Sequence, residues 1–227
     1  AEGVINDELL ACRKDIWNAV REYSMKLICL SPAEFIHFGT TRELLDLVTN
    51  NVEDYAFLSW SKKVMTTGAE DNFDFAAHNA YIGHAAVIEK NCYIENSYIL
   101  DNSIVHSGAI VSNLHLRNAE VPSNTVWHGV TLKDGSSLIR VYGINDNPKA
   151  RMRNKGGFLE STLSEFICNN NLLYEDLWDD EEDYLWFAKL YPMCKSRKES
   201  VEMAIILNKM AANTATDLEV KRWKQCK

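Results

Sequence analysis

The sequence predicts a mixed α and β protein in which a short parallel β-helix is flanked by an α/β segment and a helical region. Three observations predict this. Between 75 and 142 charge falls and β-branched residues rise. Apolar residues recur there at about every sixth position. On both sides, apolar residues follow the 3.6-residue period of helices. We therefore divide the chain into 1–74, 75–142 and 143–227.

The first segment combines helix and strand. Over 6–23 the apolar positions approach a 3.6-residue period, with Asn6 or Asp7 as the N-cap, which predicts a helix. Short apolar runs predict strands at 27–30 and 35–38, separated by a break at 31–34. Thr40 or Thr41 is expected to cap a second helix that has Glu43 in its first turn. The apolar stripe of that helix is Leu44, Leu45, Leu47 and Val48.

The middle segment contains hexads that each open on an aliphatic residue: Ile82, Ile88, Ile94, Val105 and Val111. A strand of two or three residues and a tight corner fit six residues, and three such sides close a triangular coil. The aliphatic residue then points inward, while Gly, Asn and Asp suit the corners. The pattern resembles the hexapeptide repeat of left-handed parallel β-helices, with two to three coils. An antiparallel meander would instead alternate with period two.

Local sequence signals predict how the hexad repeats end and where the helices of the third segment lie. Residues 121–130 are expected to form a further coil with a bulky side chain turned outward. Gly156 and Gly157 mark a boundary before helices around 163–167 and 217–224, and a helix that starts at Ser196. An apolar segment at 185–191 ends at a proline. These helices, together with the first segment, are expected to cap the open ends of the β-helix.

Composition narrows the classes of function. The net charge of the 227 residues is −8 and there is no basic stripe, so we expect no nucleic-acid partner. No apolar stretch approaches the ~20 residues of a membrane span, and no signal peptide is visible. Six scattered cysteines without metal-binding spacing fit reduced thiols in a cytoplasmic protein. The acidic run between 175 and 183 is interpreted as a solvated surface.

Catalytic motifs are missing. There is no Walker loop, no Gly-x-Gly-x-x-Gly, no His-Glu-x-x-His and no Gly-x-Ser-x-Gly, so we assign no catalytic residue and no metal ligand. His84 and His106 occupy corner-like positions, where hexapeptide acyltransferases place a histidine base, although such histidines are more often solvated or hydrogen-bonded. Trp127 and His128 pair an aromatic platform with a hydrogen-bonding group, as sites for sugars or bases do. Packing in the core is the alternative for this pair.

A longer motif points to a family. Residues 32–45, PAEFIHFGTTRELL, precede the hexads, and the segments VYGINDNPK at 141–149 and LWFAKLYP at 185–192 follow them. This order resembles the L-fucokinase/GDP-L-fucose pyrophosphorylase family over about 30–215. The resemblance implies an internal fragment that lacks the N-terminal nucleotide-binding loop and the C-terminal kinase. It also implies the reaction of fucose 1-phosphate with GTP to GDP-fucose, with Mg²⁺ as the cofactor of the parent enzyme.

The same resemblance suggests substrate contacts. Related enzymes place a metal-binding aspartate where this chain has His37, and Mg²⁺ prefers oxygen ligands. We therefore expect His37 to contact a sugar hydroxyl or phosphate, or only to pack. His37 and Thr40 of the motif, with Trp127 and His128, form the predicted substrate-binding set.

The leading hypothesis is a central piece of a bacterial fucose-salvage enzyme, which completes the sugar side of the pocket and is inactive alone. One alternative is a stand-alone hexapeptide-repeat acyltransferase, for which the number of coils is small. The other is a non-catalytic oligomerisation module. The expected ligands in the parent are fucose 1-phosphate, GDP-fucose or GTP, and a homo-oligomer is compatible with the array.

Overall fold

The computed structural model describes residues 6–31, 33, 35–36, 39–69, 71–72, 74–151, 156–179 and 183–226. Contacts divide the chain into two units, Ala1–His37 and Phe38–Lys227, and each is described by itself. The boundaries at 74/75 and 142/143 stay a prediction.

The first unit contains one helix, α1 (Asp7–Val20), capped by the side chain of Asn6 as predicted. None of its side chains is buried. The strand predicted at 27–30 is wrong: these residues form no strand, and Leu27 and Ile28 are 93% and 80% exposed. An apolar run becomes a strand only when a neighbouring strand accepts its backbone hydrogen bonds, and the described part of this unit offers none.

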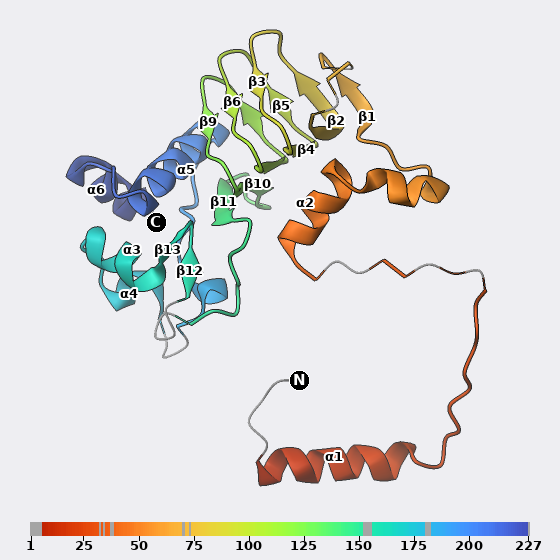
Figure 1. The fold of residues 1–227 in the computed structure, drawn as a ribbon. Helices are drawn as coiled ribbons and strands as arrows, with labels where there is room; N and C mark the ends of the chain where they lie inside the picture. The colour runs from red at the N-terminus through yellow and green to blue at the C-terminus, as the bar shows by residue number, and fades with distance from the viewer. Residues whose placement is uncertain are drawn as a thin grey trace. The chain divides into compact units, whose positions relative to one another are not determined.

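The second unit contains a β-solenoid whose strands stack as parallel ladders on three faces (Figure 1). The first face holds β2 (Ala76–Ile82), β4 (Tyr93–Glu95), β7 (Ile110–Ser112) and β10 (Thr125–Thr131). The second holds the end of β2 with β5 (Tyr98–Ile99) and β8 (His115–Leu116). The third holds β3 (Val87–Ile88), β6 (Ile104–Val105) and β9 (Glu120–Val121). The stack has about four turns, more than the two to three expected.

Strand pairing fixes the length of a turn. On the first face Ala77, Ile94 and Val111 are successive partners, each 17 positions after the last. Such a turn is one residue short of three hexads. The corners are made by residues with positive φ that recur once per turn: Asn79, Asn96 and Asn113; Asn91, Gly108 and Asn124; Asn102 and Asn118. Asparagine tolerates this left-handed conformation better than most residues, so the corner residues expected from the sequence are confirmed.

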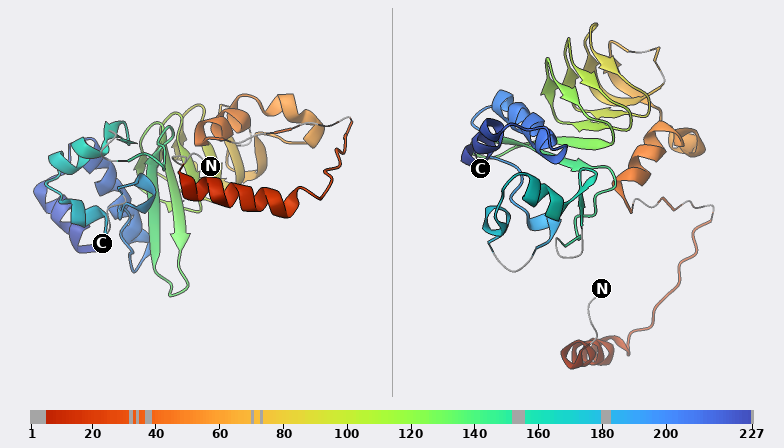
Figure 2. Two further views of the ribbon diagram at one scale, coloured as in Figure 1. Left: turned by 90° about the horizontal axis from the view of Figure 1, so that it is seen from below. Right: turned by 60° about the vertical axis from the view of Figure 1, so that its left-hand side comes forward.

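The inward side chains of the first face form an apolar column, which continues into the antiparallel strand β11 (Ser137–Gly143). Its five members all have 0% exposure: Ala77, Ile94, Val111, Trp127 and Val141. The prediction that a bulky side chain in 121–130 turns outward is therefore wrong for Trp127, whose side chain fills the column at the last turn. Figure 2 shows the hairpin of β10 and β11 reaching past the stacked turns.

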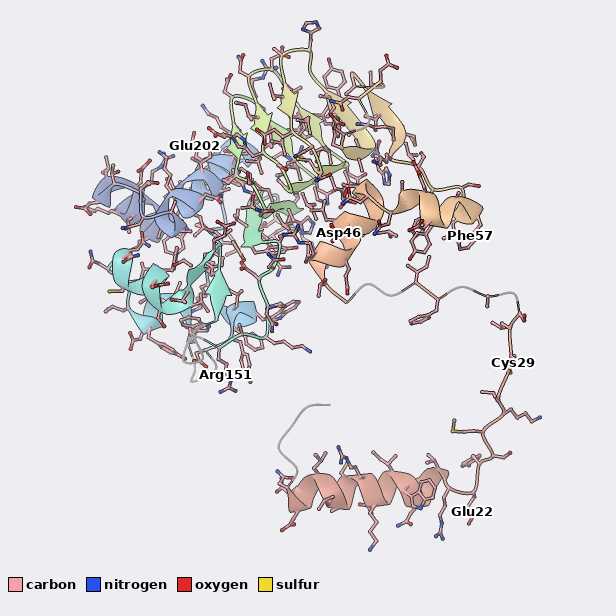
Figure 3. All side chains as sticks on the ribbon, viewed as in Figure 1. Glu22, Cys29, Asp46, Phe57, Arg151 and Glu202 are labelled. Atoms are coloured by element: carbon pink, nitrogen blue, oxygen red, sulfur yellow. The ribbon has the colours of Figure 1, made fainter. Side chains whose placement is uncertain are left out.

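Two further elements precede the solenoid in this unit. Helix α2 (Thr41–Thr49) begins with a capping box in which Thr40 and Glu43 bond each other's backbone. Of the two predicted caps, Thr40 and Thr41, Thr40 is the one that caps the helix, and Glu43 lies in its first turn as predicted. It is followed by the 3-10 helix η1 (Val52–Leu58) and by β1 (Lys63–Thr67), which pairs in parallel with β2. Figure 3 labels Asp46 on α2 and Phe57 on η1.

The C-terminal segment shares one continuous core with the solenoid. It contains the hairpin β12 (Gly157–Phe158) and β13 (Ser161–Thr162), then α3 (Leu163–Asn169), α4 (Tyr174–Leu177), the 3-10 turn η3 (Leu185–Phe187), α5 (Arg197–Ala211) and α6 (Asp217–Cys226). The helix start at Ser196 is confirmed, since its hydroxyl caps α5. Glu202 of α5, labelled in Figure 3, forms an ion pair with Arg222 of α6.

The described helices include none that is both long and apolar enough to cross a membrane. All six cysteines are free. Burial raises the pKa of Cys92 and of Cys194 to about 11, so both thiols are expected to remain protonated and unreactive.

The corner geometry gives a stability prediction. Asn91 has φ 57°, and a β-carbon without a compensating local hydrogen bond is disfavoured there. We expect Asn91→Ala to lower the free energy of unfolding by about 1–2 kcal/mol. Asn91→Gly, which removes the steric cost, should lie within about 0.5 kcal/mol of wild type. Urea denaturation measures both; equal losses in the two variants would contradict the corner argument.

Candidate functional site

The outer surface of the first face carries a row of polar side chains, one from each of five paired strands. Strand pairing places them as successive Cα neighbours: His78, Glu95, Ser112, His128 and Arg140. We call this set the polar row. Because side chains alternate along a strand, these residues lie two positions from a second outward row: Ala76, Tyr93, Ile110, Val126 and Tyr142. The inward column lies between the two.

Helix α2 covers the second row. Leu45 and Val48 pack with four of its members in one buried cluster, against which Tyr142 is partly buried. The polar row lies beside this cover and remains half-buried, apart from Ser112, which is buried. The register of one face thus sorts its outward side chains into a covered apolar strip and a solvent-accessible polar strip.

A hydrogen-bonded chain links the first three members of the polar row. The Tyr93 hydroxyl lies 3.1 Å from His78 Nδ1 and 3.1 Å from Glu95 Oε2, and its single proton can serve only one of them at a time. The Ser112 hydroxyl donates to Glu95 Oε1 at 2.6 Å. Burial, and then the nearby Glu95 carboxylate, raise the pKa of Tyr93, so its hydroxyl stays protonated.

The other end of the row has a different character. His128 and Arg140 are direct cross-strand partners. Burial and the positive charge of Arg140 lower the pKa of His128, against the opposing effect of Glu95, so the imidazole is neutral at pH 7. The Arg140 guanidinium lies 5.6 Å from the centre of the Trp186 ring. Among the described residues neither side chain has a hydrogen bond or an ion pair.

The row therefore combines an anionic acceptor at one end with a cationic donor at the other. Glu95 can accept hydrogen bonds from hydroxyl groups, while Arg140 and His128 can donate to an anion. The one hydroxyl that donates to a carboxylate in this row, that of Ser112, belongs to a side chain that is only 4% exposed, so it is poorly placed to attack a substrate. The arrangement suits binding rather than bond cleavage.

The structure separates the predicted substrate-binding residues. His37 lies outside the described residues. The Thr40 hydroxyl accepts from the backbone N–H of Glu43 at 3.2 Å and so caps α2. Trp127 is fully buried, which favours packing over a ligand platform, and its indole N–H has no acceptor among the described side chains and backbone. Only His128 of the described members lies in the polar row.

Sequence reasoning missed Glu95, Ser112 and Arg140. A signal was present for the first two, because Tyr93-Ile94-Glu95, Ile110-Val111-Ser112 and Val126-Trp127-His128 share one pattern of a bulky, an apolar and a polar residue. Aligning these triplets at the turn length would have placed their polar members in one row. Arg140 has no such signal, since it enters through the antiparallel strand β11.

His84 and His106, the two histidines considered as bases for acyl transfer, have different surroundings. His84 lies exposed at a corner. Both ring nitrogens of His106 face carboxylates: Nδ1 lies 2.9 Å from Glu89 Oε1 and Nε2 lies 2.7 Å from Glu120 Oε1. His106 therefore bridges neighbouring turns and has no nitrogen available as a general base.

The described residues contain no group of three or more His, Cys, Asp or Glu side chains that could hold a metal ion. Mg²⁺ is held by oxygen ligands, usually one or two carboxylates together with substrate phosphates and waters.

The fold and the polar row define a β-solenoid protein with a candidate binding site for a ligand that has both hydroxyl groups and negative charge. Comparison with known proteins gives the family. The model of the fucose pyrophosphorylase domain matches residues 2–196, and the chain belongs to this family.

Curated relatives agree with this family. The chain is 26% identical to the L-fucokinase/L-fucose-1-P guanylyltransferase of Bacteroides fragilis, over 79% of this chain and 19% of that protein. It is 23% identical to the bifunctional fucokinase/GDP-fucose pyrophosphorylase of Arabidopsis thaliana, over 78% and 18%. It is 22% identical to the human fucose-1-phosphate guanylyltransferase, over 93% and 38%. The chain thus spans about a fifth of the two bifunctional relatives. No solved structure matches it significantly.

The role of Thr40 is testable. If its hydroxyl acts only as a cap, Thr40→Ala should lower the free energy of unfolding by about 1 kcal/mol, whereas Thr40→Ser keeps the cap and should match wild type. Chemical denaturation measures stability, and titration with fucose 1-phosphate measures affinity. A loss of affinity in a Thr40→Ala variant that remains folded in the assay, with Thr40→Ser binding as wild type, would contradict a purely structural role.

The His106 bridge predicts a pH effect. The hydrogen bond to Glu120 and the contact with Glu89 raise the pKa of His106. The backbone N–H of Ser107, and then His106, lower the pKa of Glu89. Among the described residues, Lys209 lines the same pocket as His106 and Glu120, and it is paired with Glu219. A raised pKa means that the stabilisation is full below the unfolded pKa of about 6.5 and is lost as the pH rises through the folded value.

We therefore expect the stability advantage of wild type over His106→Gln to shrink as the pH rises above about 6.5. Denaturation at several pH values measures it, and His84→Gln, at an exposed corner, is the matched control. An advantage that is constant or grows with pH would contradict the bridge.

Proposed function

We propose that the chain is a part of an enzyme that makes GDP-L-fucose from fucose 1-phosphate and GTP, and that it supplies part of the sugar side of the pocket. The observation that carries the proposal is the polar row, in a chain of the fucose pyrophosphorylase family. Glu95 and His128 are hydrogen-bonding side chains of the kind that recognise sugar hydroxyls. The relatives' printed names include the guanylyltransferase or pyrophosphorylase activity and, for two of them, a fucokinase.

We further propose that this chain is inactive alone. The sequence has no glycine-rich phosphate cradle, which a nucleotide-transferring enzyme needs, because convergent backbone N–H groups stabilise phosphates. The exposed apolar residues Leu27, Ile28 and Leu30 are compatible with packing against a further domain. Mg²⁺ is proposed as a cofactor of the whole enzyme.

The array is proposed as a left-handed, hexapeptide-type β-helix. A cytoplasmic location, a bacterial origin and self-association complete the proposal. The six free cysteines fit a reducing compartment. The acyltransferase alternative is weakened by the carboxylates that occupy both nitrogens of His106.

Activity and binding test the proposal separately. The purified 227-residue chain with fucose 1-phosphate, GTP and Mg²⁺ should form no GDP-fucose, and clear turnover would refute its inactivity. Calorimetry with fucose 1-phosphate and with GDP-fucose should give saturable heat. Silence with both would favour an oligomerisation module without a ligand.

A matched pair of variants locates the sugar. Glu95→Gln keeps the shape of the side chain but removes its charge, and we expect it to weaken fucose 1-phosphate binding by about tenfold. Glu175→Gln, on an exposed position of α4, should leave the affinity unchanged. Equal affinities for Glu95→Gln and wild type would remove the polar row from the sugar pocket.

A further inference from the structure

Arg140 is a half-buried positive charge in the C-terminal half of the chain. Several other positive charges of this half have acidic partners: Arg151 with Asp183, Lys189 with Asp179, Lys209 with Glu219, Arg222 with Glu202 and Lys224 with Asp176. Arg140 is half-buried, and within the described residues no carboxylate pairs with it. A partly buried charge without a partner costs stability, because it loses water without gaining an ion pair.

The Trp186 contact does not account for the unused donors of Arg140. A cation over a ring that is itself 61% exposed gains only a weak attraction, because water screens it. This contact uses none of the five N–H groups of the guanidinium. A planar guanidinium presents those donors in a fork that matches two oxygens of a phosphate.

His128 provides a second donor beside this fork. Direct cross-strand partners have Cβ atoms about 4.5–5.5 Å apart, so one tetrahedral anion can contact both side chains. The imidazole is neutral and, like Arg140, has no hydrogen-bond partner among the described residues. An anion bound between the two side chains would contact the positive charge of Arg140 and one N–H group of His128.

Glu95 sets the direction of the ligand. It lies three strand positions from Arg140, or about 14 Å at the usual strand spacing. Its negative charge repels an anion from that end of the row and attracts hydroxyl groups. A molecule with a phosphate at one end and hydroxyl groups at the other therefore fits the row in one orientation.

We propose that Arg140 and His128 form the binding site for the phosphate group of a sugar phosphate. The inference rests on the proposed function for the identity of the sugar, but the anion site stands on the cross-strand pair alone. Arg140 supplies the main contact with the phosphate, Trp186 lies beside the guanidinium, and His128 completes the site.

The test measures binding of fucose 1-phosphate, another hexose 1-phosphate and inorganic phosphate to the 227-residue chain by calorimetry. We expect Arg140→Gln to weaken fucose 1-phosphate binding by about 10- to 100-fold. Arg140→Lys, which keeps the charge but not the fork, should be intermediate. His128→Asn should lose a few-fold, and Arg117→Gln, which removes a charge from an exposed position after β8, should bind as wild type.

The outcomes separate the two proposals. If Arg140→Gln weakens all three ligands and the sugars are not distinguished, the anion site stands and the fucose assignment fails. If fucose 1-phosphate binds equally to wild type and to a folded Arg140→Gln variant, the anion site is wrong. Circular dichroism checks folding, and His128→Asn provides an independent measurement should Arg140→Gln unfold. Absence of phosphate binding by wild type overturns the anion site whatever the sugar result.

Discussion

The structure depends on parallel strands returning to register once every 16 or 17 residues. This return aligns backbone donors and acceptors of each turn with those of the next, so Ala77, Ile94, Val111 and Trp127 pair in sequence. It can occur only if the chain turns three times per coil, and asparagines with positive φ make most of those corners. Once the register is set, every position within a turn defines a column along the stack.

The columns explain how one sheet face serves both folding and binding. Inward columns are apolar because they are shielded from water on all sides. Outward columns need no single character, and here two adjacent ones differ: α2 covers the column that contains Tyr93, and the column that contains Glu95 stays accessible. A change of one side chain in the accessible column alters one point of the row and leaves the ladder of backbone hydrogen bonds unchanged.

Local signals made much of the fold predictable, and distant pairing made the rest unpredictable. The six-residue spacing indicated a coil, and Asn6, Thr40 and Ser196 marked helix starts correctly because capping involves only neighbours. The strand at 27–30 was wrong because strand formation needs a partner elsewhere. Of the polar row, only His128 was predicted, because it follows the aromatic residue Trp127. Trp127 itself was predicted to point outward and instead lies in the core. Arg140 required the pairing of β10 with β11, which no repeat spacing reveals.

The charge distribution of the row argues for a shared pocket rather than a complete one. A sugar phosphate would find acceptors at Glu95 and donors at Arg140, but a nucleotide would need a cradle of backbone N–H groups that the sequence lacks. The chain covers 18–19% of the two bifunctional relatives, so most of such a protein has no counterpart in these 227 residues. The proposed division of labour therefore gives the sugar to the polar row of the solenoid and the nucleotide to a separate part of the enzyme.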